Sequence, residues 1–153
     1  MFLLKQALKL HNFAYKLANK LAIQDGVHQK HRLMNYKQFF LDNINSTDNV
    51  IDIGCGNGYL SFALSQKAKY VLGIDIDENN ISFAKEKYQK DNLKFVLGDA
   101  TSFISAEQFD VAVLSNVLEH IEQRPSFLAK IKAPKFLIRV PILERSWIVL
   151  MKK

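Results

Sequence analysis

The chain has 153 residues, of which 48% are hydrophobic and 24% charged, and its formal net charge is +6. This length and composition fit one globular domain, and no apolar run reaches the roughly 18–20 residues that a membrane-spanning helix needs. The single cysteine, Cys55, cannot form an internal disulfide, so we expect a reducing, cytoplasmic setting. Lysines are scattered along the chain instead of clustered, which favours a solvated surface over a nucleic-acid partner.

The N-terminal part of the chain predicts two helices. Over residues 2–23 apolar side chains recur at helical spacing while most lysines fall on other faces, which predicts an amphipathic helix. Such a helix covers a sheet or core, and the alternative for a cationic one is a membrane surface. A polar loop over residues 25–32 leads to a second predicted helix, Leu33–Ile44, and then to a cluster of turn-forming residues. We therefore expect residues 1–48 to be N-terminal helices that cover a domain of residues 49–153.

In the second part, short apolar runs alternate with helical stretches. The runs are rich in Val, Ile and Leu without polar alternation, as in parallel strands covered on both faces. Strands that alternate with helices form right-handed crossovers and a doubly wound sheet. We predict an α/β fold with a mostly parallel sheet in the order 3-2-1-4-5. The predicted strands are Val50–Ile53, Tyr70–Asp75, Leu93–Leu97, Asp110–Leu114 and Phe136–Val140, and the predicted helices run to about Lys67 and over residues 79–90, 117–123 and 126–132, the last two separated by a break at Pro125.

A glycine turn follows the first predicted strand. It reads Asp52-Ile-Gly-Cys-Gly-Asn-Gly58, so glycines stand at three alternate positions. Without Cβ atoms the backbone can approach a ligand closely and adopt positive φ. The N-terminus of the following helix offers free N–H groups to an anionic group. The turn therefore predicts a site where a small, partly anionic molecule lies against backbone.

The next predicted strands end in residues that suit a nucleoside. In an open α/β sheet, ligands lie outside the C-terminal ends of the strands. Asp75, about twenty residues beyond the glycines, can accept hydrogen bonds from both hydroxyls of a ribose. Its neighbour Ile76 can lie against a base. Asp99 can accept a hydrogen bond from an exocyclic amine, and the Ala100 N–H can donate to a ring nitrogen. These features together predict an adenosine site, whereas Asp77 is expected to cap the next helix.

The spacing of the glycines separates two ligand classes. Dinucleotide sites use G-x-G-x-x-G, and its third glycine would stand where this chain has Tyr59. The chain instead has G-x-G-x-G, with Asp52 two residues before the first glycine. A ligand without a pyrophosphate fits better, and an NAD-dependent oxidoreductase is the distant alternative. A nucleophilic role for Cys55 is disfavoured, because the turn needs a small side chain and cysteine acts as a small hydrophobe.

Four segments resemble the successive motifs of class I S-adenosylmethionine-dependent methyltransferases, in the small-molecule methyltransferase group. They are Val50-Ile-Asp-Ile-Gly-Cys-Gly-Asn-Gly58, Gly73-Ile-Asp-Ile-Asp77, Gly98-Asp-Ala100 and Phe109-Asp-Val-Ala-Val-Leu-Ser-Asn-Val-Leu-Glu-His-Ile121. The resemblance extends roughly from Asn49 to Pro141. It implies that residues 49–153 form a Rossmann-like S-adenosylmethionine-binding domain whose cofactor site is covered by the N-terminal helices.

The resemblance also implies which residues bind the cofactor. The first motif lines the methionine part, the second takes the ribose, the third takes the adenine, and the end of the fourth strand lies near the sulfonium. No metal site is expected. The expected cofactor-binding residues are Asp52, Gly54, Cys55, Gly56, Gly58, Asp75, Ile76, Asp99, Ala100, Ser115 and Asn116.

The implied reaction is attack of an acceptor O, N, S or C atom on the sulfonium methyl group, which leaves S-adenosylhomocysteine. A general base helps when the acceptor is a hydroxyl, and the candidates are His31 and His120, with His28 in the same polar loop as His31. A motif of Asn or Asp followed by two prolines and an aromatic residue would indicate nucleobase amino groups, but that position reads Ser115-Asn-Val-Leu. A small-molecule acceptor is therefore expected.

The family's sheet has two further strands, an antiparallel hairpin beside the fifth. The chain continues about a dozen residues past its fifth predicted strand, so we expect a truncated form in which the sixth and seventh strands are missing. Two alternatives follow: a domain that binds the cofactor without catalysis, or a sheet completed by a partner chain. An exposed fifth strand and the tail around Trp147 would form the contact of a homodimer.

Overall fold

The computed structural model describes residues 35–102 and 107–141, and before them residues 6, 10, 13, 14, 17, 21, 23–24 and 27–28. Predictions for His31, for Trp147 and for most of the first helix fall outside the described residues, as does the side chain of His28. The sheet and its covering helices belong to one compact unit, residues 37–146. Within the described residues, no helix is long and apolar enough to cross a membrane.

Five parallel strands form the sheet of this unit, in the order β5-β4-β3-β6-β7. This is the predicted order 3-2-1-4-5, so the predicted fold class is confirmed. The central strands are buried along nearly their whole length, because helices cover both faces. The strands are β3 (Asn49–Ile53), β4 (Tyr70–Asp75), β5 (Leu93–Leu97), β6 (Val111–Ser115) and β7 (Lys135–Arg139).

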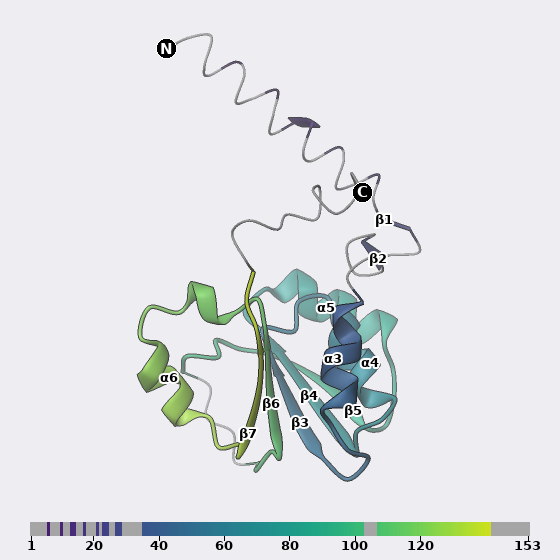
Figure 1. The fold of residues 1–153 in the computed structure, drawn as a ribbon. Coiled ribbons are helices and arrows are strands. Elements are labelled where there is room, and N and C mark those ends of the chain that lie inside the picture. Colours follow the sequence, from purple (N-terminus) through teal and green to yellow (C-terminus); the bar gives the residue numbers. More distant parts are fainter. Residues whose placement is uncertain are drawn as a thin grey trace. The chain divides into compact units, whose positions relative to one another are not determined.

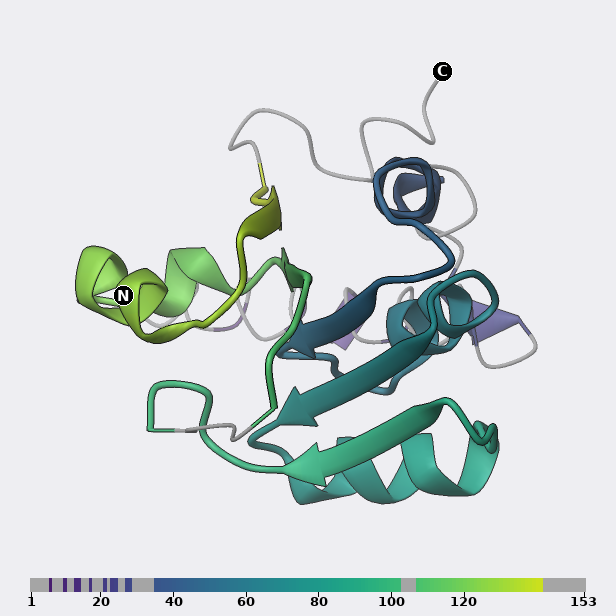
Figure 2. The ribbon, with the colours of Figure 1, turned by 90° about the horizontal axis from the view of Figure 1, so that it is seen from below.

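The helices lie on both faces of the sheet: α6 (Arg124–Lys130) on one, and α3 (Tyr36–Asp42), α4 (Tyr59–Ser65) and α5 (Glu78–Lys87) on the other (Figures 1 and 2). On the α6 side, Phe127 packs into a core with the apolar side chains of the central strands. On the other side, Ile81 and Ala84 of α5 pack against Phe95 of β5 and Cys55 of the glycine turn. This second core holds the turn against the sheet.

Local sequence signals explain where α5 begins and ends. The Asp77 side chain accepts hydrogen bonds from the N–H groups of Asn79 and Asn80, so Asp77 is the N-cap that we predicted. Glu78 in the first turn and lysines in the last turn match the charges of the helix dipole. The capping bonds hold the loop between β4 and α5, which borders the ligand site.

Three predictions of local structure are wrong. Residues 25–32 are not all loop, because β2 (Val27–His28) pairs antiparallel with β1 (Ile23–Gln24). The helix predicted over residues 117–123 is a single 3-10 turn, Leu118–His120. Pro125 begins a helix instead of breaking one, since it lies in the first turn of α6, where a missing N–H costs no hydrogen bond.

Candidate functional site

The glycine turn connects β3 to α4 with a left-handed backbone. Gly54, Gly56 and Gly58 have φ angles of 68°, 55° and 78°. Residues other than glycine rarely adopt this left-handed conformation. The N–H groups of Gly54 and Cys55 donate to the Ile74 carbonyl oxygen at 2.8 and 3.0 Å. The turn is thereby fixed to the end of β4, the strand that carries Asp75.

The three glycines have different surroundings. A Cβ on Gly54 would lie 2.4 Å from Cγ2 of Val117, and one on Gly58 would lie 2.7 Å from the Phe95 ring. These two glycines are needed for packing as well as for their φ. A Cβ on Gly56 would meet nothing within 4 Å. The backbone of Gly56 therefore faces open space, where a ligand can lie against it. We call the backbone of Gly54 and Gly56 the cradle.

The Asp75 carboxylate is tied to the turn. Its Oδ2 accepts a hydrogen bond from the Gly56 N–H at 2.8 Å, and its Oδ1 accepts one from the Asp77 N–H at 2.9 Å. The Asn80 side-chain amide donates to the same Oδ1 at 3.5 Å. Each carboxylate oxygen has two lone pairs, so Oδ2, which accepts one hydrogen bond, keeps acceptor capacity for a ligand hydroxyl. Oδ1 gains the same capacity when a second hydroxyl replaces its long contact with Asn80.

The end of β5 lies next to the end of β4. The Gly98 N–H donates to the Asp75 carbonyl oxygen at 2.9 Å, which brings Asp99 to the same edge of the sheet. Asp99 is exposed, and its Oδ1 accepts hydrogen bonds from the N–H and the hydroxyl of Thr101, both at 2.8 Å. These two bonds lower the pKa of the Asp99 carboxyl below its ordinary value. Ile76, the next residue after Asp75, is 71% exposed, which is unusual for isoleucine, and it offers an apolar surface there.

Two residues of the predicted set lie behind the turn. Asp52 is buried, and the Ser61 hydroxyl donates to its Oδ2 at 2.6 Å. Burial raises the pKa of Asp52 to about 7, partly offset by the Ser61 hydrogen bond and reinforced by the negative charge of Asp75. Cys55 packs in the α5 core, and burial, with the nearby carboxylates, raises its pKa above the ordinary thiol value. A thiol in this state is a poor nucleophile, in agreement with the prediction that Cys55 serves as a small hydrophobe.

The remaining predicted contacts lie at the ends of β5 and β6. Ala100 is half-buried and packs against the α6-side core. Ser115 is half-buried, while Asn116 is exposed and has a φ of 60°, in the left-handed region. The Arg139 guanidinium at the end of β7 donates to the Asn116 side-chain oxygen at 3.1 Å. Arg139 is not among the predicted site residues, although its position at the end of a strand is a signal in the sequence.

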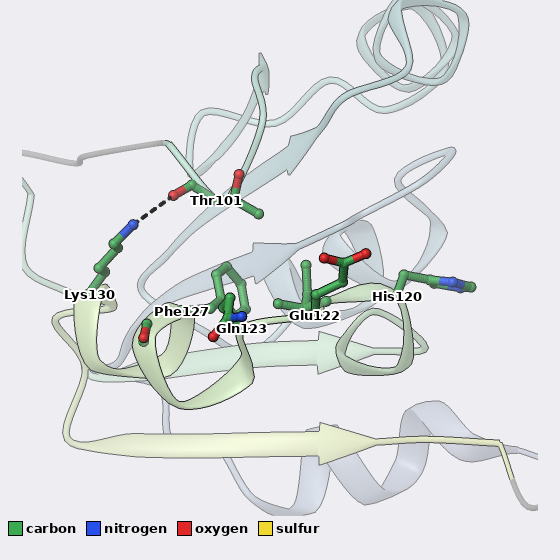
Figure 3. A pocket seen from close by; sticks show the side chains of 8 residues that line it. Thr101, His120, Glu122, Gln123, Phe127 and Lys130 are labelled. Carbon is green, nitrogen blue, oxygen red and sulfur yellow. Dashed lines mark hydrogen bonds between the residues drawn. The ribbon is translucent and has the colours of Figure 1, made fainter.

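His120 lies at one side of a pocket of about 260 Å³ between the Asp99–Thr101 loop and α6 (Figure 3). Phe127 forms part of the lining, and Lys130 Nζ donates to the Thr101 carbonyl oxygen at 3.4 Å. The exposed His120 side chain extends away from Phe127 and Lys130. Among the residues that the structure describes, no group of three or more His, Cys, Asp and Glu side chains comes together as a metal site.

The arrangement can bind a nucleoside whose ribose faces Asp75. Two carboxylates with acceptor capacity, an exposed isoleucine and an open stretch of backbone lie along one edge of the sheet. Carboxylate oxygens accept hydrogen bonds from hydroxyl and amino groups, and an apolar ring can lie against the exposed Ile76 side chain. Gly56 leaves room for a chain that extends from the sugar. The geometry therefore fits an adenosine with a short polar substituent.

Comparisons with known proteins agree with this geometry. The methyltransferase domain family matches residues 51–133. The probable cobalt-precorrin-6B C(15)-methyltransferase (decarboxylating) of Methanococcus maripaludis (strain C7 / ATCC BAA-1331) is 33% identical over 113 residues, which are 72% of this chain and 62% of the relative. The ubiquinone biosynthesis O-methyltransferase of Stutzerimonas stutzeri (strain A1501) is 36% identical over 83 residues, 52% of this chain and 36% of the relative.

Among solved structures, coclaurine N-methyltransferase bound to N-methylheliamine and SAH has the same fold, with a TM-score of 0.63 at 22% identity, over 74% of this chain and 36% of that one. The chain spans less than two thirds of the length of these relatives. The family match covers more than half of the chain. The protein therefore belongs to the methyltransferase domain family, as its motifs predict.

Proposed function

We propose that the protein binds S-adenosylmethionine and transfers its methyl group to a small-molecule acceptor. The observation that carries this proposal is the hydrogen bond from the Gly56 N–H to Asp75, beside backbone that faces open space. Membership of the methyltransferase family supports it, and so do the names of relatives that act on a cobalt-precorrin and in ubiquinone biosynthesis.

The edge of the sheet suggests how the cofactor lies. Asp75 accepts the two ribose hydroxyls, Ile76 covers one face of the adenine, and Asp99 accepts from the adenine amino group while the Ala100 N–H donates to the ring. The methionine part follows Gly54 and Gly56. Asp52, Cys55 and Gly58 support this cradle from behind, since all three are buried. Ser115 and Asn116 lie at the sulfonium end.

When bound, the cofactor supplies a methyl group that is already activated by the sulfonium charge. The protein therefore has mainly to align the acceptor atom with the methyl carbon. Alignment alone can lower the barrier by roughly 7–11 kcal/mol. For a hydroxyl acceptor, His120 and His31 are the proposed bases, and the N-terminal residues 1–48 are the proposed cover over the cofactor.

A second candidate, a sheet completed by a partner, rests on the β7 edge. Ile138 and Val140 are 37% and 49% exposed at this edge of the described sheet, and exposed apolar edges favour pairing with another chain. A homodimer through this edge is the proposed form. Light scattering across a range of concentrations tests it, and a monomer throughout would contradict it. We also propose a cytoplasmic location, in keeping with the lone cysteine.

Transfer of a labelled methyl group tests the main proposal. The protein is incubated with methyl-labelled S-adenosylmethionine and a panel of small hydroxyl, amine, thiol and carbon acceptors, with Asp75→Ala as the inactive control. Label should pass to at least one acceptor with the wild type and to none with the variant. Binding of the cofactor without transfer to any acceptor would favour the non-catalytic alternative.

A further inference from the structure

A reciprocal contact joins the ends of β6 and β7. Ser115 and Arg139 stand opposite each other in the parallel register. The Asn116 N–H donates to the Arg139 carbonyl oxygen at 2.8 Å, and the Arg139 guanidinium donates to the Asn116 side-chain oxygen at 3.1 Å. The same Nη1 lies 3.5 Å from the Ser115 hydroxyl oxygen. Asn116 is therefore held to Arg139 by its backbone and by its side chain.

Asn116 needs to be held, because its backbone conformation is unfavourable. Its φ of 60° lies in the left-handed region, which asparagine enters more readily than most residues but still at a cost. Strained conformations persist where surrounding groups determine them. The Arg139 side chain is half-buried, and its planar guanidinium gives a directed hydrogen bond that a flexible lysine would not.

The conformation of Asn116 determines where the next residue lies. Val117 turns back toward the glycine turn, and its Cγ2 is 2.4 Å from the point that a Cβ of Gly54 would occupy. Val117 thus packs directly on the backbone that begins the cradle. A change in the Asn116 backbone would move Val117 off Gly54, and the turn would lose the contact on that side.

We propose that Arg139 is a positioning residue for the methyl-transfer end of the site. It holds Asn116 in the left-handed conformation and thereby keeps Val117 against Gly54. Arg139 acts through Asn116 and needs no contact with the cofactor. This inference rests on the proposed function only for the identity of the ligand that the cradle binds.

A double-mutant cycle tests this, with S-adenosylhomocysteine as the probe. Glycine adopts positive φ without help, so in an Asn116→Gly background the role of Arg139 should disappear. We expect Arg139→Gln to weaken binding about tenfold in the wild type and less than about twofold in the Asn116→Gly background, the non-additivity expected of residues in contact. Lys135→Gln, which removes a positive charge from the other end of β7, is the matched control and should leave affinity unchanged.

A second readout needs no ligand. In ¹H–¹⁵N spectra of the free protein, Arg139→Gln should shift the amide signals of Gly54 and Gly56 in the wild type and leave them in place in the Asn116→Gly background. Equal effects of Arg139→Gln in both backgrounds, or no effect in either, would overturn the inference. If Arg139→Gln does not fold, Arg139→Lys in both backgrounds decides by the same criterion. Should the wild type not bind S-adenosylhomocysteine, the proposed function fails, and the spectra still decide the role of Arg139.

Discussion

The Asp75 carboxylate accepts a hydrogen bond from the Gly56 N–H at 2.8 Å, across 19 positions of the chain. One end of β4 and the glycine turn after β3 are thereby joined before any ligand arrives. A carboxylate whose position is already fixed loses little entropy when it binds a ligand. The same bond places the acid beside the only one of the three turn glycines that faces open space.

Replacing Asp75 should weaken binding without unfolding the domain. Asp75→Ala removes the acceptor for the ribose hydroxyls, and hydrogen bonds to a charged group are worth enough to cost about 10–100-fold in affinity for S-adenosylhomocysteine. Asp91→Ala, which removes an exposed carboxylate outside the site, is the matched control and should leave both the affinity and the free energy of unfolding unchanged. Calorimetric titration and urea unfolding of both variants measure the two quantities. Equal affinity in Asp75→Ala and wild type would contradict the ribose assignment.

Alanine at Gly56 should weaken ligand binding in addition to lowering stability. The left-handed backbone costs an alanine about 1–2 kcal/mol, and no atom blocks the added Cβ. The Cβ would instead occupy the cradle. We expect urea unfolding to show this loss of stability and calorimetry to show a loss of binding of at least about tenfold, because the added Cβ would fill the space of a ligand that lies against the Gly56 backbone. Unchanged binding would mean that the cofactor does not lie against Gly56.

Alanine at Gly54 should behave differently. In addition to the cost of its φ, its Cβ would overlap Val117, and overpacking typically adds about 1–3 kcal/mol. Gly54→Ala should therefore lower the free energy of unfolding more than Gly56→Ala does. The double variant Gly54→Ala with Val117→Ala should recover the part due to overlap, as measured by urea unfolding. If the second substitution recovers nothing, the contact between Gly54 and Val117 is not the cause.

Asp52 should make stability depend on pH. Its pKa is about 7 in the folded protein against 3.8 ordinarily, mainly because of burial. Between about pH 4 and 7 the folded state keeps a proton that the unfolded state has lost, so this group makes stability fall as pH rises through that window. Asp52→Asn, which cannot ionise, should remove the effect. From pH 5 to pH 8 the wild type should lose on the order of 2 kcal/mol relative to the variant in urea unfolding. Parallel pH profiles of the two proteins would contradict the raised pKa.

Asp99 should distinguish the adenine amino group from a carbonyl. S-inosylhomocysteine carries an oxygen in place of that amino group, so the wild type should bind it about tenfold more weakly than S-adenosylhomocysteine. Asp99→Asn should reduce this preference, because an amide can also donate to the inosine oxygen. Asp91→Asn, a change of another exposed carboxylate, is the control and should keep the preference. No discrimination by the wild type would remove Asp99 from the adenine contact.

The sequence was sufficient to predict the sheet, because continuous apolar runs identify buried parallel strands. The bounds of β4 and β5 agree with the predictions, and strand–helix alternation with the family motifs predicted the strand order. The short 3-10 turn at Leu118 was missed, because a 3-10 turn and an α-helical turn have similar local patterns. The site was predicted as a set of strand ends, since parallel strands bring their C-terminal ends to one edge.

The detail within the site could not be read from the sequence. Three glycines at alternate positions look equivalent, yet Gly54 and Gly58 face side chains and Gly56 faces open space. Burial of Asp52 behind the turn depends on how α4 packs, and the contact of Arg139 with Asn116 depends on the pairing of two distant strands. Such differences arise from tertiary packing and leave no local pattern.

Binding of S-adenosylhomocysteine to the wild-type protein, compared with NAD by calorimetry, tests the central claim most directly. We expect saturable one-to-one binding of S-adenosylhomocysteine and no heat of binding from NAD, because Tyr59 stands where a dinucleotide site has its third glycine. Binding of NAD without binding of S-adenosylhomocysteine would contradict it.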